Sequence, residues 1–161
     1  DALPIYLPFS LLRLFLPVEI ANTVVMYIKN YNYQAYGIEI LEPLHRIAMG
    51  GERRFQMLRN AEPHERYDFG STEIGFVIGD VRYSKWPNNA NIVFVGSAIY
   101  GEKTMKSIEQ RIVENLPVGG KVITLTRQLF KDTDDFRKVD AVLVKMSWGH
   151  STSYIYKRVK K

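Results

Sequence analysis

Residues 91–127 constrain the fold most, because they have the pattern of a strand, a helix and a second strand in close succession. The apolar run NIVFVGSA (residues 91–98) is typical of a buried strand. Residues 101–116 place an apolar stripe at helical spacing, formed by Met105, Ile108, Ile112 and Leu116. The sequence PVGG then ends the helix before a second strand, KVITLTR (residues 121–127). This unit predicts two parallel strands covered by a helix.

The segments before this unit continue the alternation. Residues 21–30 (ANTVVMYIKN) predict a helix, because three apolar residues share a helical face. Residues 35–40 (AYGIEI) predict a short buried strand, and residues 74–80 (IGFVIGD) predict another. Between them, residues 43–58 predict a helix with proline in its first turn and the pair GG as a point where it can break.

Two strand-like runs, residues 140–148 and 152–159, close the chain with no helical pattern between them, which predicts an antiparallel pair. The fold class expected is therefore α/β, a Rossmann-like three-layer sandwich whose sheet is mostly parallel with a C-terminal antiparallel strand. We expect one domain over residues 1–161, with an N-terminal helical segment (1–17) and an α/β core (18–161).

The first residues, DALPIYLPFSLLRLFLP, contain an arginine and three prolines, and their apolar run is shorter than the roughly 20 residues that span a bilayer. They also lack the basic start and the small-residue cleavage site of a signal peptide. We expect an amphipathic helix capped by Ser10. Because the chain begins with Asp and not Met, we also expect that a segment upstream was removed or is not shown.

The 161 residues include no cysteine, which excludes disulfides and thiolate sites and favours an intracellular protein. His45, His64 and His150 lack metal-ligand spacing, so no metal site is expected. The net charge of +5 slightly favours acidic partners such as nucleic acid or nucleoprotein, although a merely basic domain explains it equally well.

Three predicted strands end in residues suited to binding a nucleoside. Ligands of open α/β sheets bind beyond the carboxyl ends of the strands. Glu39 ends the first of these strands, where its carboxylate can accept hydrogen bonds from both hydroxyls of a ribose; the alternative is a solvated loop residue. Asp80 ends the second and can accept from the amine of adenine. The third ends in small residues that let a ligand approach the backbone, namely Gly96, Ser97 and Ala98.

The stretch NIVFVGSAIYGEKTMKSIEQRIVENLPVGGKVITLTRQL, together with MSWGHSTSYIYKR near the end, resembles the non-SET histone lysine methyltransferases, the disruptor-of-telomeric-silencing family. The resemblance covers roughly residues 34–158 and is distributed along them. It implies the class I S-adenosylmethionine-dependent methyltransferase fold, S-adenosylmethionine as cofactor, and transfer of a methyl group to a lysine amine. A histone or nucleosome substrate would imply a nuclear protein, and any other substrate a cytoplasmic one.

The resemblance also implies roles for individual residues. Glu39 would hold the ribose and Asp80 the adenine. Gly96 would lie near the methyl group, where the family has asparagine. Tyr100 and Tyr154 would line the lysine channel, with Trp148 behind them. The remaining residues expected to line the cofactor are Gly37, Ile40, Gly79, Val81 and Ser97.

One departure from the family concerns the glycine-rich cofactor loop. That loop should follow the N-terminal helix, but the chain there reads FLPVEIAN, without glycine and without room for a preceding strand. The glycines of DFGSTEIG (residues 68–75) do not replace it, because a strand and not a helix follows them, which predicts a turn into that strand. Half of the cofactor pocket has therefore been lost, or a segment near residues 17–20 is missing from this chain.

Three interpretations of function remain open: a lysine methyltransferase, a methyltransferase acting on RNA or another protein, and a degenerate methyltransferase fold that serves as an interaction module. Basic residues also crowd the C-terminus, at Lys157, Arg158, Lys160 and Lys161. They predict contact with nucleic acid phosphates beside the substrate site; the alternative is a solvated tail.

Overall fold

A computed structural model describes residues 23–29, 32–60, 73–87, 90–97, 100–131, 133–146 and 149–160. Two helices lie in this part of the chain, α2 (Glu42–Asn60) and α3 (Glu102–Asn115). The described strands are β1 (Thr23–Lys29), β2 (Asn32–Glu39), β3 (Glu73–Ile78), β4 (Ile92–Val95), β5 (Lys121–Leu125), β6 (Phe136–Met146) and β7 (Gly149–Arg158). The predicted N-terminal helix, Trp148 and residues 68–72 lie outside the described residues.

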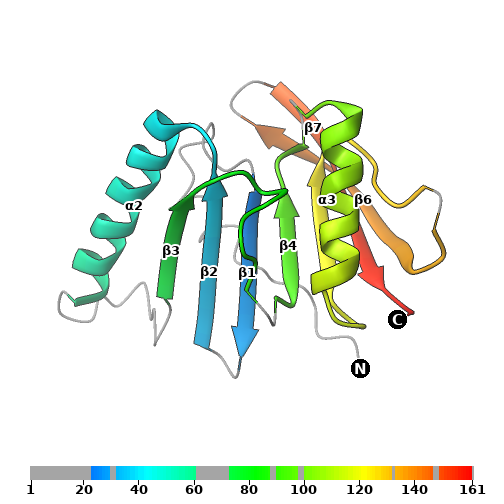
Figure 1. The fold of residues 1–161 in the computed structure, drawn as a ribbon, viewed down its shortest axis with the longest axis horizontal. Helices are drawn as coiled ribbons and strands as arrows, with labels where there is room; N and C mark the ends of the chain where they lie inside the picture. The colour runs from blue at the N-terminus through cyan, green and yellow to red at the C-terminus, as the bar shows by residue number, and fades with distance from the viewer. Residues whose placement is uncertain are drawn as a thin grey trace.

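The strands form one seven-stranded sheet in the order β3-β2-β1-β4-β5-β7-β6 (Figure 1). The pairs β2–β3 and β4–β5 are parallel, and α2 and α3 respectively connect their strands, as the alternation predicted. The order of the first five strands, 3-2-1-4-5, is that of the doubly wound dinucleotide-binding fold. The predicted closing pair is also confirmed, because β7 is antiparallel to both β5 and β6.

The prediction of a helix over residues 21–30 is wrong, because residues Thr23–Lys29 form the central strand β1. The segment is rich in β-branched residues, which suit a strand, and its apolar spacing fits a helical face only over one turn. Both edges of β1 are paired, with β2 on one side and β4 on the other, and both pairings are antiparallel. Only tertiary pairing could therefore decide between helix and strand here.

The reversal of β1 also changes the expected sheet. Four of the six ladders are antiparallel, although β2, β3, β4, β5 and β6 run in one direction and only β1 and β7 run against them. The expectation of a mostly parallel sheet is therefore correct for strand direction and wrong for strand pairing. The chain passes from β1 to β2 without a helix, whereas α2 connects β2 to β3 and α3 connects β4 to β5.

The main apolar core lies between the sheet and α3, which stands in front of the sheet in Figure 1. The predicted stripe of α3 is buried in it, and the helix ends before the predicted PVGG turn, where Gly119 adopts a φ of 87°. On β3, Val77 packs against this core, whereas Ile74 points to the other face and is buried there. β3 therefore carries a partly buried apolar side chain on one face and a buried one on the other.

Helix α2 runs unbroken through Gly50 and Gly51, where the sequence had suggested a break. It lies beside β3, at the end of the sheet opposite α3 (Figure 1). Phe55 and Ala48 of this helix are buried.

Neither described helix is long and apolar enough to cross a membrane.

Candidate functional site

The carboxyl ends of β2, β3, β4 and β5 meet at one edge of the sheet, because these four strands run in the same direction. Glu39 ends β2, Asp80 follows β3, and Gly96 follows β4. The tips of β2 and β3 are joined directly, since the amide of Gly79 donates a hydrogen bond of 2.8 Å to the carbonyl of Glu39. The structure therefore brings the predicted strand-end residues to one edge.

Glu39 is buried, with 3% of its surface exposed. Its Oε1 accepts a hydrogen bond of 2.8 Å from the amide of Leu41, in the turn that leads into α2. An ionised carboxylate offers about four acceptor positions, and the bond to the Leu41 amide uses one of them. The side chain is thus held in place by the backbone rather than solvated, contrary to the loop alternative for this residue.

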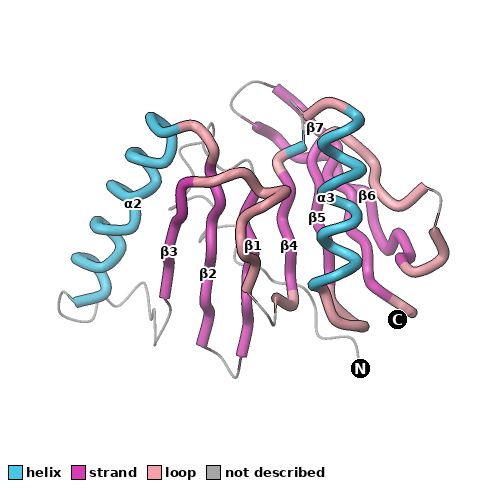
Figure 2. The backbone as a smooth tube through the Cα atoms, viewed as in Figure 1, coloured by secondary structure: helices cyan, strands magenta, loops and turns pink. Residues whose placement is uncertain are grey.

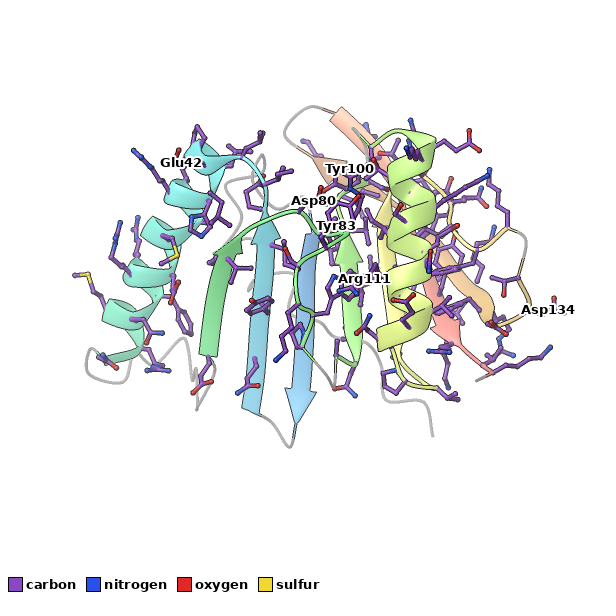
Figure 3. The ribbon with its side chains drawn as sticks, in the orientation of Figure 1. Glu42, Asp80, Tyr83, Tyr100, Arg111 and Asp134 are labelled. Carbon is purple, nitrogen blue, oxygen red and sulfur yellow. The ribbon has the colours of Figure 1, made fainter. Side chains whose placement is uncertain are left out.

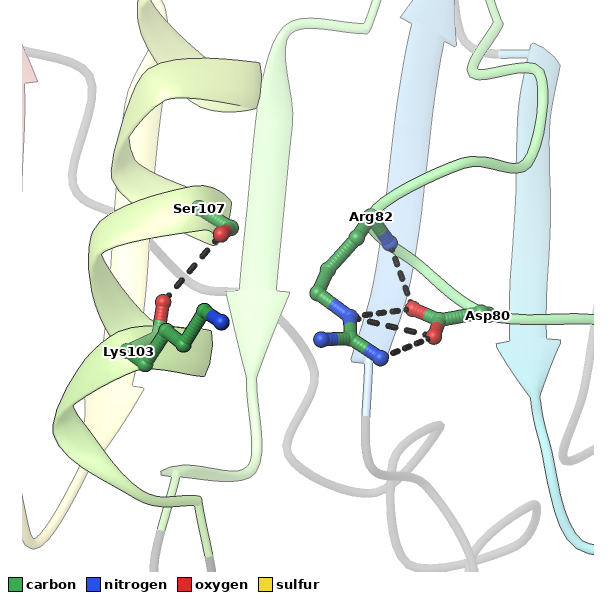
Figure 4. Close-up of polar contacts among 4 residues, drawn as sticks. All are labelled: Asp80, Arg82, Lys103 and Ser107. Carbon is green, nitrogen blue, oxygen red and sulfur yellow. Dashed lines mark hydrogen bonds and ion pairs between the residues drawn. The ribbon is translucent and has the colours of Figure 1, made fainter.

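Asp80 forms an ion pair with Arg82, two residues further on (Figure 4). Nε of Arg82 lies 3.0 Å from each carboxylate oxygen of Asp80, Nη2 lies 2.5 Å from Oδ2, and the amide of Arg82 donates to Oδ1 at 2.9 Å. The side-chain hydrogen bonds from Arg82 lower the pKa of Asp80, against a smaller opposing effect of burial. An adenine amine would therefore have to share this carboxylate with a guanidinium.

This ion pair predicts an acid-dependent contribution to stability. Because the pKa of Asp80 is lower in the folded state, its contribution to the free energy of unfolding is present above the unfolded pKa of about 3.9 and is lost as the pH falls through the folded pKa. We expect Asp80→Asn to lose less stability than wild type between about pH 5 and about pH 2. Urea denaturation at several pH values measures this, with exposed Asp134→Asn as the control. Equal losses in all three proteins would contradict the prediction.

The tip of β4 is closed against β5. Ser97 is buried, and its hydroxyl donates a hydrogen bond to the carbonyl of Leu125 at the end of β5. The amide of Tyr100 donates to the carbonyl of Ser97 at 3.4 Å. The side chain of Ser97 therefore ties two strand tips together, and Gly96 is the small, half-buried residue beside it.

The two predicted channel tyrosines pack against the same core from different elements. Tyr100 precedes α3, and Tyr154 lies on β7 opposite Thr124 of β5, which in turn pairs with Val95 at the tip of β4. The Nζ of Lys138 lies 5.8 Å from the centre of the Tyr154 ring. The Tyr154 ring thus already borders an ammonium group near the carboxyl edge.

Residues 79–87 form a strap over the sheet that the sequence did not predict. After β3 it crosses the upper ends of β2 and β1 (Figure 2). Trp86 anchors it, with 2% of its surface exposed and its Nε1 donating a 2.9 Å hydrogen bond to the carbonyl of Val81. Arg111 of α3 donates to the carbonyl of Ser84 at 2.6 Å and lies over the Trp86 ring. The strap fixes Gly79, Asp80 and Val81 relative to α3.

Figure 3 shows Asp80, Tyr83, Arg111 and Tyr100 gathered over the central strands, between the two helices. Arg82, Trp86 and Arg111 are the residues that sequence reasoning missed. The Asp-x-Arg spacing after the third predicted strand was the one available signal for the ion pair, whereas the contact of Arg111 joins residues 27 positions apart. Ile40, also expected to line the cofactor, is 55% exposed beside Glu39.

A pocket of about 450 Å³ lies elsewhere, over the first halves of β2 and β3. Tyr36, Gly75 and Trp86 contribute to its lining, together with Gln34 and Glu73, which are joined by a 2.9 Å hydrogen bond. Residues predicted to hold the cofactor do not line it. It is therefore separate from the carboxyl edge that contains Glu39 and Asp80.

The described residues fit one half of a nucleoside cofactor and not the other. Glu39 is a carboxylate at a strand tip, the position from which an acidic residue binds the ribose in such folds. The glycine turn of such folds follows the first parallel strand, but β1 runs the other way and its carboxyl end, Lys29, lies at the opposite edge. The glycine turn that the sequence lacks therefore also has no corresponding strand end in the topology of the described sheet.

Comparison with solved structures finds the same fold in methyltransferases. TrmN from Thermus thermophilus matches with a TM-score of 0.54 and 13% identity, over 77% of this chain and 36% of that one. The N-methyltransferase NodS from Bradyrhizobium japonicum, in complex with S-adenosyl-L-homocysteine, matches with a TM-score of 0.52 and 12% identity, over 76% of this chain and 65% of that one. A SAM-dependent methyltransferase from Methanosarcina mazei gives 0.52 and 10%, over 80% and 83%.

No family model and no curated protein matches the sequence. At these identities the structural matches establish the fold alone. The chain has the α/β fold of S-adenosylmethionine-dependent methyltransferases, and it spans about a third of TrmN and about two thirds of NodS.

Proposed function

We propose that this chain is an S-adenosylmethionine-dependent methyltransferase domain whose substrate is a protein lysine. The observation that supports it best is the pair of carboxylates, Glu39 and Asp80, at the tips of two neighbouring parallel strands in a methyltransferase fold. Glu39 would accept hydrogen bonds from the ribose. Asp80, oriented by Arg82, would accept from the adenine amine.

S-adenosylmethionine, when bound, supplies an electrophilic methyl group. The residues of this chain would present the amine that attacks it. A lysine ammonium has an unperturbed pKa of about 10.4 and must lose a proton before it can act as a nucleophile. A channel walled by Tyr100 and Tyr154 would remove water from the amine, which favours its neutral form, and would align it. The approach of Lys138 to the Tyr154 ring supports this assignment, because aromatic faces attract ammonium groups.

A second candidate is supported by the reversed β1. A methyltransferase fold that lacks the first glycine turn can persist as an interaction module without cofactor. Two observations favour lysine as the methyl acceptor, namely the sequence resemblance and the two tyrosines. The fold itself does not distinguish lysine from an acceptor group in RNA or elsewhere in a protein. A chromatin substrate would imply a nuclear protein.

Transfer of radiolabelled methyl groups to histones, nucleosomes, total RNA and cell lysate separates these functions. We expect label in protein, and we expect Tyr154→Ala to reduce kcat about 100-fold because the amine is no longer aligned. Tyr154→Phe retains the aromatic wall and should restore most of the activity. Leu143→Ala is the control, since Leu143 is 68% exposed on the neighbouring strand β6.

Label found only in RNA would refute the lysine substrate. Unchanged transfer in Tyr154→Ala would remove this tyrosine from the channel. A folded protein that neither binds S-adenosylmethionine nor transfers methyl would favour the interaction module. The melting temperature of each variant has to be compared with wild type, because Tyr154 packs against the core.

A further inference from the structure

Three basic residues lie directly opposite one another on three neighbouring strands. Lys121 of β5 pairs with Lys157 of β7, and Lys157 pairs in turn with Arg137 of β6. Directly opposed residues of antiparallel strands project to the same face of the sheet. The three side chains therefore form one cationic row, called the basic row below, which the sequence alone did not bring together.

The basic row lies on the face of the sheet away from the α3 core. Val122 and Tyr156, the neighbours of Lys121 and Lys157 along their strands, are buried in that core, so the lysines point to the other face. None of the three cations forms an ion pair with the carboxylate of another described residue. Like charges placed directly opposite one another repel, so the basic row lowers the stability of the isolated protein.

The basic residues near the C-terminus differ in whether their side chains already contact other groups of the protein. Nη1 of Arg158 donates hydrogen bonds to the carbonyls of Val113 (2.6 Å) and Leu116, at the end of α3. Arg158 therefore caps this helix and is not available to a partner. Lys160 lies 3.8 Å from Asp134. Lys157 is exposed and belongs to the basic row.

The backbone beneath the basic row is firmly held. The amide of Lys121 donates to the carbonyl of Asn91 at 2.8 Å. The amide of Gly119 donates to the carbonyl of Arg158, and the amide of Arg158 donates to the carbonyl of Gly120, both at 2.9 Å. The three cations therefore project from a rigid sheet and not from a frayed tail.

We propose that Lys121, Lys157 and Arg137 bind the phosphate backbone of a nucleic acid. Neighbouring strands are about 4.8 Å apart, so the row spans about 10 Å between its outer Cα atoms. Consecutive phosphates of one strand rise by about 3.4 Å along the axis of a duplex while winding around it, and each of the three long side chains can reach one phosphate. A regular repeat of like charges suits such a row, whereas a protein partner bound on this face would also contact the next row, formed by the half-buried Ile123 and Ile155 and by Asp140.

The basic row is distant from the proposed catalytic edge. Lys121 begins β5, whose carboxyl end at Leu125 is about 13 Å away for a strand of this length. Tyr154 projects to the opposite face from Lys157, because three positions separate them on one strand. Nucleic acid bound at the row would therefore leave the carboxyl edge open and act as an anchor.

The test measures binding of labelled single-stranded RNA and duplex DNA by fluorescence anisotropy across a series of salt concentrations. Three phosphate contacts predict a slope of log K against log salt of about −2.1 for single strands and about −2.7 for duplex, or roughly 20- to 40-fold weaker binding between about 50 and about 200 mM salt. In the variant Lys121→Gln, Arg137→Gln, Lys157→Gln we expect the slope to lose about 2 to 3 units, and in Lys157→Gln alone about 1.

The matched control is Arg53→Gln, Arg54→Gln, Lys103→Gln, which removes the same charge from exposed helix positions. We expect it to retain the wild-type slope. An equal loss of slope in the control would show that the effect depends only on net charge, and it would overturn the proposal. So would absence of wild-type binding at low salt, or displacement of the nucleic acid by polyglutamate at equal charge concentration, which would indicate an acidic protein partner. None of these outcomes depends on methyl transfer.

Discussion

Glu39→Ala is expected to weaken the binding of S-adenosylmethionine by about 100-fold or more, measured by isothermal titration calorimetry. The variant removes two charge-assisted hydrogen bonds to the ribose, each contributing about 1.5–3 kcal/mol, and about 1.4 kcal/mol corresponds to a factor of ten. Glu39→Gln retains one acceptor oxygen without the charge and should lie between wild type and Glu39→Ala. The demethylated product should show the same order, because it contains the same nucleoside.

The control for this prediction is Glu42→Ala, which makes the same change in charge three residues further along. Glu42 is exposed at the start of α2 (Figure 3). It forms an ion pair with Arg46 on the surface. Because the Glu39 carboxylate also holds the amide of Leu41, urea denaturation of each variant has to show that the fold is retained. Unchanged affinity in Glu39→Ala would remove Glu39 from the site. No binding by wild type would instead favour the interaction module.

Trp86→Ala is expected to lower the free energy of unfolding by about 3–5 kcal/mol, a large part of the roughly 5–15 kcal/mol typical of a domain. Trp86 belongs to the strap, and its buried side chain packs in the core next to α3, with Arg111 over its ring. Its loss would leave a cavity and release the segment that positions Asp80, so cofactor affinity should fall as well. Urea denaturation and calorimetry measure the two effects.

Trp86→Phe provides the conservative comparison, since it fills most of the volume and loses the hydrogen bond to Val81, at a cost of about 1 kcal/mol. Lys85→Ala changes an exposed residue of the same strap and should remain within about 0.5 kcal/mol of wild type. A loss below about 1 kcal/mol in Trp86→Ala would show that the strap is not anchored by this residue.

The proposed methyltransferase site and the proposed nucleic acid site lie at different places on the sheet. The carboxyl edge contains the carboxylates and tyrosines, and the basic row lies near the other end of β5 on the far face. A nucleic acid held at the row would keep the domain close to a nucleoprotein substrate without entering the site. The interaction-module alternative would retain this binding and lose only the chemistry, so the two measurements together distinguish the cases.

The sequence by itself determined the two strand–helix–strand units, the buried stripe of α3, the closing antiparallel pair and the strand ends at Glu39, Asp80 and Gly96. These are local patterns, in which the spacing of apolar residues and the turn residues of PVGG agree with the final structure. It also showed that the glycine loop is absent, because that signal is a short contiguous motif.

Only the tertiary structure decided the state of residues 23–29, the pairing of Asp80 with Arg82, the anchoring of the strap and the basic row. The apolar residues of β1 satisfy both a helical and a strand pattern, and its two neighbouring strands settled the choice by pairing with its backbone. Arg111 with Ser84, and Lys121 with Lys157 and Arg137, are far apart in sequence and meet through register. Local propensity contains no information about register, so such contacts become visible only when the sheet is assembled.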